Sequence, residues 1–250
     1  MGKTHEALER AEKEYTQTVM QSAHASEKTV ATKKPPHVFM PPPSESEQFQ
    51  EVKTKLITRF AEGSVKSIMI TGTAHGDGTS FTASSFATTL AQDCRLNVLL
   101  IDANLRFPRL HEVFKIDHNQ GLTNLLTQEK EEASLFKKVG RGDLYLLPCG
   151  GNHTGPLSLF ESNRFDQTLK KMRDKFDYVL LDSPPVNDCA ESRVIAAKVD
   201  GVVLVIESGK TRSQVAVKAK QELEDAGANI LGVILNRRKH FIPEWIYKRL

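Results

Sequence analysis

Residues 67–80 read Ser-Ile-Met-Ile-Thr-Gly-Thr-Ala-His-Gly-Asp-Gly-Thr-Ser, and this stretch decides the fold. Its first half is a short apolar run of the kind that forms a buried strand. Its second half is rich in glycine, and the Ala-, Ser- and Thr-rich residues that follow predict a helix over about 80–93. A strand, a glycine-rich loop and a helix in this order are the local context of a phosphate-binding loop.

Apolar runs like the first recur along the chain and alternate with helical patterns. After residues 67–71 they occur at 97–101, 144–147, 178–181, 202–206 and 230–235, and the helical patterns between them fall at roughly 80–93, 121–137, 162–175, 190–198 and 213–226. Continuous apolar strands separated by helices predict a parallel sheet covered on both faces. Right-handed crossovers then give a doubly wound, mostly parallel α/β fold of the P-loop NTPase type, with ligands beyond the carboxyl ends of the strands.

The segments outside this pattern differ in composition. Residues 1–15 predict a short amphipathic helix, for which a solvated tail is the alternative. Residues 16–45 are rich in proline and polar side chains and predict a linker. We expect the nucleotide-binding domain over residues 46–240, and its first residues predict a helix with an apolar stripe. Residues 241–250 predict a basic, aromatic tail that contacts a membrane surface, a partner or the parent domain. The stripe consists of Phe49, Val52, Leu56, Ile57 and Phe60.

Bulk composition excludes several classes of protein. The net charge of +3 over 250 residues is too small to indicate nucleic acid as a partner. No apolar run approaches the roughly 18–20 residues that span a bilayer, and the N-terminus has no secretory pattern. The three cysteines, Cys94, Cys149 and Cys189, have neither metal-ligand spacing nor the pairing of a disulfide framework. We therefore expect a cytoplasmic protein.

The glycine-rich loop approximates the phosphate-binding pattern GxxxxGK[ST]. Gly76 and Gly78 permit backbone geometries closed to other residues, and the loop amides can surround an anion. Ser80 occupies the position whose hydroxyl reaches Mg²⁺, but Thr79 replaces the lysine and Thr73 the opening glycine. An ordinary glycine-rich turn is the alternative. The residues predicted to bind nucleotide here are Ala74, His75, Gly76, Asp77, Gly78, Thr79, Ser80 and Phe81.

Acidic and polar side chains follow three other strands at the same expected edge of the sheet. Asp102 and Asp182 each end an apolar run, so together with Ser80 they are the predicted Mg²⁺ ligands and would orient a nucleophile. Arg106 could neutralise phosphate charge or be a surface arginine. Asn236, after the last run, could hydrogen-bond a base edge or cap a turn.

Several segments together resemble the bacterial tyrosine autokinases of capsule and exopolysaccharide synthesis (CpsD/CapB type), relatives of the ParA/MinD group of ATPases. The most specific segment is Val98–His111, VLLIDANLRFPRLH, which is similar to that family's second aspartate motif. The resemblance covers about residues 44–240. Other segments match in order: Gly121-Leu122, Leu146–Pro148 with Gly150, Asp182–Val186, Asp200–Val205 and Leu231–Asn236.

This resemblance implies a specific activity and specific partners. It implies ATP and Mg²⁺ as ligands, phosphotransfer to tyrosine, and Asp102, Asn104 and Asp182 as catalytic residues. It also implies a homo-oligomer at the inner face of the membrane, held there by a membrane polysaccharide co-polymerase that determines chain length.

The sequence departs from the family pattern at four places. Thr79 stands at the lysine position, and Asn104 stands where a second aspartate is usual. The oligomer-forming glutamate and two arginines correspond to Glu47, Gln50 and Lys53, and the C-terminal tyrosine cluster is reduced to Tyr247. These departures leave two alternatives open, a catalytically inactive regulator and a partitioning-type ATPase. The ATPases usually carry an extra lysine early in the loop, where this chain has Thr73, Ala74 and His75. Arg106, Lys210 or a neighbouring subunit's cation are the candidate replacements for the missing lysine.

Overall fold

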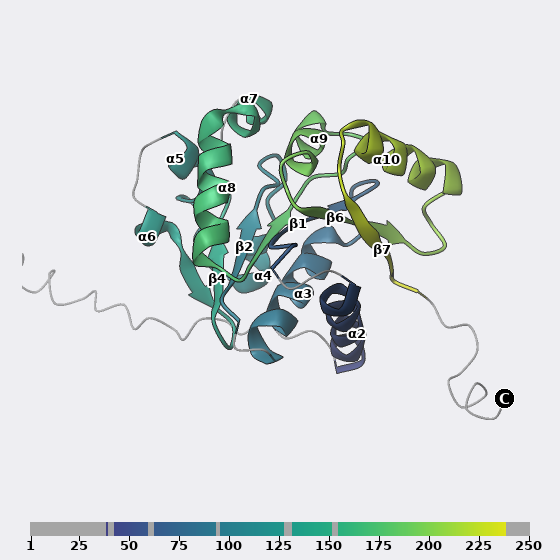
Figure 1. The fold of residues 1–250 in the computed structure, drawn as a ribbon, viewed down its shortest axis with the longest axis horizontal. Helices are drawn as coiled ribbons and strands as arrows, with labels where there is room; N and C mark the ends of the chain where they lie inside the picture. The colour runs from purple at the N-terminus through teal and green to yellow at the C-terminus, as the bar shows by residue number, and fades with distance from the viewer. Residues whose placement is uncertain are drawn as a thin grey trace, which may run out of the picture. The chain divides into compact units, whose positions relative to one another are not determined.

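The computed structural model describes residue 39 and residues 43–59, 63–93, 96–127, 132–151 and 155–238 (Figure 1). The helix expected over residues 1–15, most of the linker and the C-terminal tail lie outside these ranges. None of the helices within them combines the length and the apolarity that crossing a membrane would require.

Seven strands form a single sheet in the order β3-β4-β2-β5-β1-β6-β7. All neighbouring strands pair in parallel except β3, which runs antiparallel to β4. The strands are β1 (Ser67–Gly72), β2 (Val98–Asp102), β3 (Lys137–Val139), β4 (Leu144–Leu147), β5 (Tyr178–Asp182), β6 (Gly201–Glu207) and β7 (Ile230–Asn236). The prediction of a doubly wound, mostly parallel sheet is confirmed, and all six predicted strands are present.

Helices cover both faces of this sheet, as Figure 1 shows. One face packs against α2 (Pro43–Arg59), α3 (Thr79–Asp93) and α4 (Leu110–Phe114), which contribute Phe49, Phe86 and Phe114 to its core. The other face packs against helices that come later in the chain. These are α5 (Leu122–Leu126), α6 (Glu132–Leu135), α7 (Pro156–Glu161), α8 (Asn163–Lys175), α9 (Ala190–Ala196) and α10 (Ser213–Asp225).

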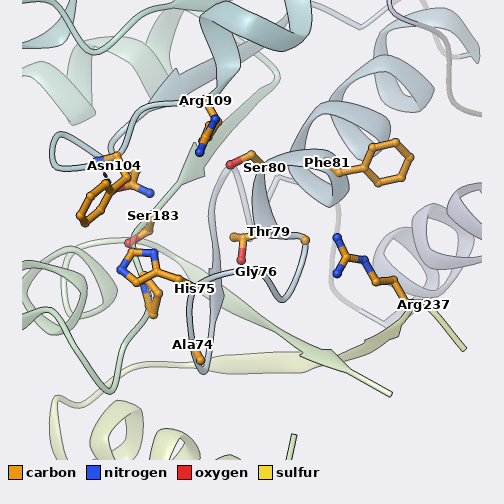
Figure 2. Close-up of a pocket in the computed structure, with 13 residues that line it drawn as sticks. Ala74, His75, Gly76, Thr79, Ser80, Phe81, Asn104, Arg109, Ser183 and Arg237 are labelled. Atoms are coloured by element: carbon orange, nitrogen blue, oxygen red, sulfur yellow. Dashed lines mark hydrogen bonds between the residues drawn. The ribbon is translucent and has the colours of Figure 1, made fainter. Parts of the chain in front are cut away.

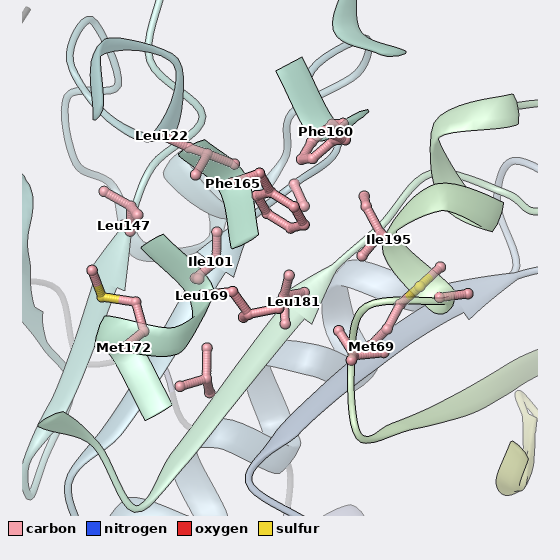
Figure 3. Packing of buried hydrophobic residues seen from close by; sticks show 14 of the residues in the cluster. Met69, Ile101, Leu122, Leu147, Phe160, Phe165, Leu169, Met172, Leu181 and Ile195 are labelled. Atoms are coloured by element: carbon pink, nitrogen blue, oxygen red, sulfur yellow. The ribbon is translucent and has the colours of Figure 1, made fainter. Parts of the chain in front are cut away.

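The central strands are apolar throughout because both of their faces are buried. Every residue of β1 and β2 is buried, and successive side chains enter opposite cores. Figure 3 shows the core between the sheet and the later helices, where Met69, Ile101 and Leu181 of the sheet belong to the same cluster as Phe160 and Phe165. The two phenylalanine rings pack edge to face with centroids 5.1 Å apart.

The local structure differs from expectation at three places. The single helix expected over 121–137 is divided into α5, α6 and the short edge strand β3. Helices α4 and α7 were not expected, because five or six residues are too few to show helical periodicity. Helix α2 begins at Pro43 rather than near Ser46, since proline is well suited to the first turn of a helix.

Parallel pairing brings the carboxyl ends of β1, β2 and β5 to one edge of the sheet. At the opposite edge, the Asp200 carboxylate accepts hydrogen bonds from the amide and the hydroxyl of Ser67, and Arg173 forms an ion pair with Asp200 and donates to the same hydroxyl. This network fixes the start of β1, the strand that leads directly into the glycine-rich loop.

Candidate functional site

The glycine-rich loop joins the central strand β1 to the N-terminus of α3. Gly76 and Gly78 adopt positive φ angles of 96° and 88°, which few other residues tolerate, and α3 begins at the next residue, Thr79. The amide of Thr82 donates to the Gly78 carbonyl, so the loop leads into the first helical turn without a break. Free amides at such a helix N-terminus favour an anion.

The carboxylate of Asp77 is turned into the loop. It accepts hydrogen bonds from the Thr73 amide (2.8 Å), the Thr73 hydroxyl (2.7 Å) and the Ala74 amide (3.0 Å), and Asp77 is 4% exposed. Asp77 was predicted to bind nucleotide, but its side chain is engaged in shaping the loop. Any contact with a ligand would therefore come from its main chain.

Asp102 and Asp182 are direct neighbours at the ends of β2 and β5. Adjacent strands lie about 4.8 Å apart, so the two carboxyl groups share one buried site. Both residues are fully buried. One oxygen of Asp102 accepts the Leu110 amide (3.2 Å), whereas its other oxygen and both oxygens of Asp182 make no hydrogen bond of ordinary geometry in the described chain, although the Ser80 hydroxyl lies close enough to Asp182 to lower its pKa.

Burial and mutual repulsion disfavour two negative charges at this site. Burial raises the pKa of Asp102 to about 7, against the opposing effect of nearby backbone amides. The pKa of Asp182 lies well above its ordinary value, first because of burial and then because of the Asp102 charge, while the Ser80 side chain acts in the opposite direction. Three buried carboxylate oxygens without hydrogen-bond partners, at the ends of adjacent strands, fit a divalent cation.

The donor set also fits a cation that is bound together with a nucleotide. Within the described ranges, no three His, Cys, Asp or Glu side chains come together as a self-sufficient metal site. Mg²⁺ usually takes only one or two carboxylates from a protein and completes its shell with water and phosphate oxygens. Asp102, Asp182 and the Ser80 hydroxyl are therefore a sufficient protein contribution.

A cavity of about 510 Å³ lies over the loop (Figure 2). Eight of the predicted site residues line it, namely Ala74, His75, Gly76, Gly78, Thr79, Ser80, Phe81 and Asn104. Residues not singled out from the sequence complete the lining: Phe107, Arg109, Ser183, Pro185 and Arg237. A volume of this size is in the range of small-ligand pockets.

Two predicted ligands make other contacts instead. Arg106 directs its guanidinium to the buried carboxylate of Glu191 and does not line the cavity. The amide nitrogen of Asn236 donates to the Asp77 carbonyl (2.8 Å), and its oxygen accepts the Arg237 amide (2.9 Å). These contacts of Asn236 are of the capping kind and join the last strand to the loop.

Two arginines supply the cavity with cations that the sequence reasoning missed. Arg109 lies immediately before α4, and Arg237 follows β7 with a positive φ angle of 55°. Arg109 lies within the motif segment Val98–His111, and Arg237 directly follows the last apolar run, so the position of each at the ligand edge was a usable signal. Asn187 was also missed, and its amide donates to the Thr73 carbonyl (3.1 Å) at the start of the loop.

Fold, loop and carboxylate pair together define a P-loop NTPase-type protein. A family model described as cellulose biosynthesis protein BcsQ matches residues 65–232. Tyrosine-protein kinase YwqD of Bacillus subtilis is 33% identical over 78% of this chain and 81% of its own length. Tyrosine-protein kinase etk of Escherichia coli is 30% identical over 82% of this chain but only 28% of its own length.

Solved structures agree with these sequence matches. The kinase domain of Escherichia coli ETK superposes with a TM-score of 0.74 at 25% identity, covering 87% of this chain and 89% of that domain. The septum site-determining protein MinD of Pyrococcus horikoshii, solved with Mg-ADP, has a TM-score of 0.58 at 21% identity over 74% of this chain and 76% of its own, and shows the shared fold. The chain belongs to the family that the BcsQ model defines and to the bacterial tyrosine kinases of capsule and exopolysaccharide synthesis, of the CpsD, CapB and YwqD type.

Proposed function

We propose that this protein is an ATP-binding tyrosine-kinase-like component of exopolysaccharide or capsule biosynthesis, which regulates chain polymerisation or export. The observation that carries the proposal is the buried pair Asp102 and Asp182, with three unpaired oxygens beside a glycine-rich loop. Unpaired buried carboxylates are costly unless they serve a ligand. A cation and a nucleotide phosphate are the ligands that this donor set suits.

Each part of the site has a role in this proposal. The amides of residues 74–80 would hold phosphate oxygens at the N-terminus of α3. Ser80, Asp102 and Asp182 would hold Mg²⁺, which when bound supplies charge neutralisation for phosphoryl transfer. Asn104 lines the cavity, and its side-chain oxygen accepts the Phe107 amide (3.1 Å), which fixes the segment that follows β2.

The kinase step needs a base for the tyrosine hydroxyl. A carboxylate at the strand ends beside the loop is the group placed to accept that proton, and Asp102 and Asp182 are such carboxylates. We assign this role to the strand-end pair, with one aspartate accepting the proton while the other remains directed at the cation.

We propose that a membrane polysaccharide co-polymerase is the partner and that the protein forms homo-oligomers. The relative etk is consistent with the first part, because this chain matches only 28% of its length and most of that protein lies outside the match. The second part rests on α2, where Glu47 is exposed and Gln50 and Lys53 are half-buried. Association at the inner face of the membrane would follow from such a partner.

A catalytically inactive regulator is the second candidate, and Thr79 favours it. A hydrogen bond to a charged group contributes about 1.5–3 kcal/mol, so the missing lysine would weaken nucleotide binding by about tenfold to a hundredfold. Charge stabilisation in the transition state of phosphoryl transfer can contribute about 10³–10⁵ in rate. Binding is therefore expected to survive the loss of lysine better than catalysis.

Calorimetry of Mg-ATP binding to the wild type and to Thr79→Lys separates these possibilities. Micromolar binding by the wild type supports the proposal, and a phosphotyrosine assay on the same protein then tests for transfer. If only Thr79→Lys binds, the natural protein is a regulator that works without nucleotide. If the wild type, Thr79→Lys and Asp102→Asn all fail to bind Mg-ATP, the site is not a nucleotide site.

A further inference from the structure

The phosphate loop lacks its own cation, and the replacements suggested by sequence are engaged elsewhere. Arg106 is held by the buried Glu191, and Lys210 forms an ion pair with Glu207 (2.9 Å). Neither lines the cavity over the loop. Among the described residues, the arginines that do so are Arg109 and Arg237.

The two arginines serve different ends of that cavity. In Figure 2, Arg109 lies on the same side of Thr79 as Ser80 and Asn104, whereas Arg237 lies on the other side, near Phe81. The metal in a P-loop site bridges the β- and γ-phosphates, and Ser80 is at the metal position. The end of the cavity near Arg109 is therefore the end for the terminal phosphate.

The backbone around Arg109 is fixed by the same carboxylate that marks the metal site. Asp102 accepts the amide of Leu110, the next residue, and this contact holds the start of α4 against the tip of β2. Phe107 is tied to Asn104 by its amide. The segment from β2 to α4 thus positions the backbone of Arg109 beside the cavity that this residue lines.

The guanidinium itself is easily released. It pairs with Glu112 at 2.8 Å, and the two side chains are 63% and 55% exposed. Ion pairs as exposed as this one contribute little to stability, so exchanging Glu112 for a phosphate has a small cost. Arginine presents a planar set of donors that matches phosphate oxygens in pairs.

We propose that Arg109 binds the terminal phosphate of the nucleotide in place of the absent loop lysine and so makes the site selective for triphosphate over diphosphate. This inference rests on the nucleotide site proposed above. It assigns the missing charge to a residue on the β2–α4 connection rather than to the loop or to a neighbouring subunit.

The test compares ATP and ADP affinities, with Mg²⁺, by calorimetry on the full chain. The variants are Arg109→Ala, Arg109→Lys and Arg141→Ala, the last being a control at an exposed arginine in the turn before β4. We expect Arg109→Ala to weaken ATP by about tenfold to a hundredfold and ADP by less than about threefold. Arg109→Lys should retain part of the ATP preference, and Arg141→Ala should match the wild type.

The outcomes separate this inference from the function on which it rests. Equal loss of ATP and ADP in Arg109→Ala would mean a structural role, and no loss of either would mean no contact; both overturn the inference while leaving the nucleotide site intact. Failure of the wild type to bind either nucleotide overturns the proposed function and the inference together. Retained ADP binding also shows that Arg109→Ala is folded.

Discussion

Replacing Asp102 by asparagine should stabilise the protein in the absence of metal while removing Mg²⁺-dependent nucleotide binding. The asparagine oxygen can accept the Leu110 amide as the carboxylate does at 3.2 Å. Its NH₂ group then takes the place of the unpaired oxygen and can donate to Asp182, which has two unpaired oxygens of its own. The substitution thus replaces two carboxylates that repel each other with a neutral amide that can donate a hydrogen bond to the Asp182 carboxylate.

The size of the effect follows from the raised pKa. A native pKa of about 7 for Asp102, against an ordinary 3.8, corresponds to about 4 kcal/mol between its two protonation states. Because the native pKa is raised, the contribution of this group to stability is fully present below about pH 4 and is lost as the pH rises to about 7. Burying the new amide costs about 1–3 kcal/mol. The net gain expected at pH 8 is therefore about 1–3 kcal/mol.

Thermal unfolding in a chelator across pH 5–8 measures this difference. For a chain of this size we expect the variant's Tm to exceed that of the wild type by roughly 2–10 °C at pH 8, with the gap closing towards pH 5. Asp143→Asn, at an exposed aspartate paired with Lys138, is the control and should leave the pH profile unchanged. A variant that is less stable than the wild type at pH 8, or that has the same pH profile, would refute the reasoning.

Three further predictions concern the loop and assembly. Gly78→Ala should lower the free energy of unfolding in urea by about 1–3 kcal/mol, because the φ angle of Gly78 is positive and the new Cβ would lie 2.0 Å from the Asn236 amide nitrogen. The control Gly209→Ala, at a glycine with a similar φ angle and open space around it, should lower the free energy of unfolding by less. Asn236→Ala should weaken ATP and GTP equally in calorimetry, because the amide holds the Asp77 carbonyl; loss of ATP alone would instead indicate base recognition. Sedimentation should detect oligomers of the wild type, and a monomer with and without nucleotide would contradict that proposal.

The sheet was predictable because its strands are buried on both faces. Runs such as Val98–Asp102 contain hardly any polar residue, and their spacing leaves room for one covering helix each. The strand β3 was missed because Lys137 and Lys138 are exposed at the sheet edge, where only Val139 needs to be apolar. The expected helix over 121–137 failed for the same reason, since short elements carry too little periodicity to be separated.

The site was predictable where it depends on strand ends and less so where it depends on side-chain direction. Asp102 and Asp182 adjoin because parallel strands end together, which sequence order alone implies. The direction of Arg106 towards Glu191 depends on a buried acid 85 residues away, which no local pattern reveals. Arg109 reaches the cavity through the bend between β2 and α4, a geometry set by tertiary contacts. The ligand roles of these residues remain predictions.

The bond between Asn236 and the Asp77 carbonyl also bears on how the protein is made. The two residues are 159 positions apart, and β1 lies between β5 and β6, which are both synthesised after it. A chain emerging from the ribosome presents the loop early but cannot secure it until β7 has been translated. The loop therefore gains its hydrogen bond from Asn236 only after the last strand has been synthesised.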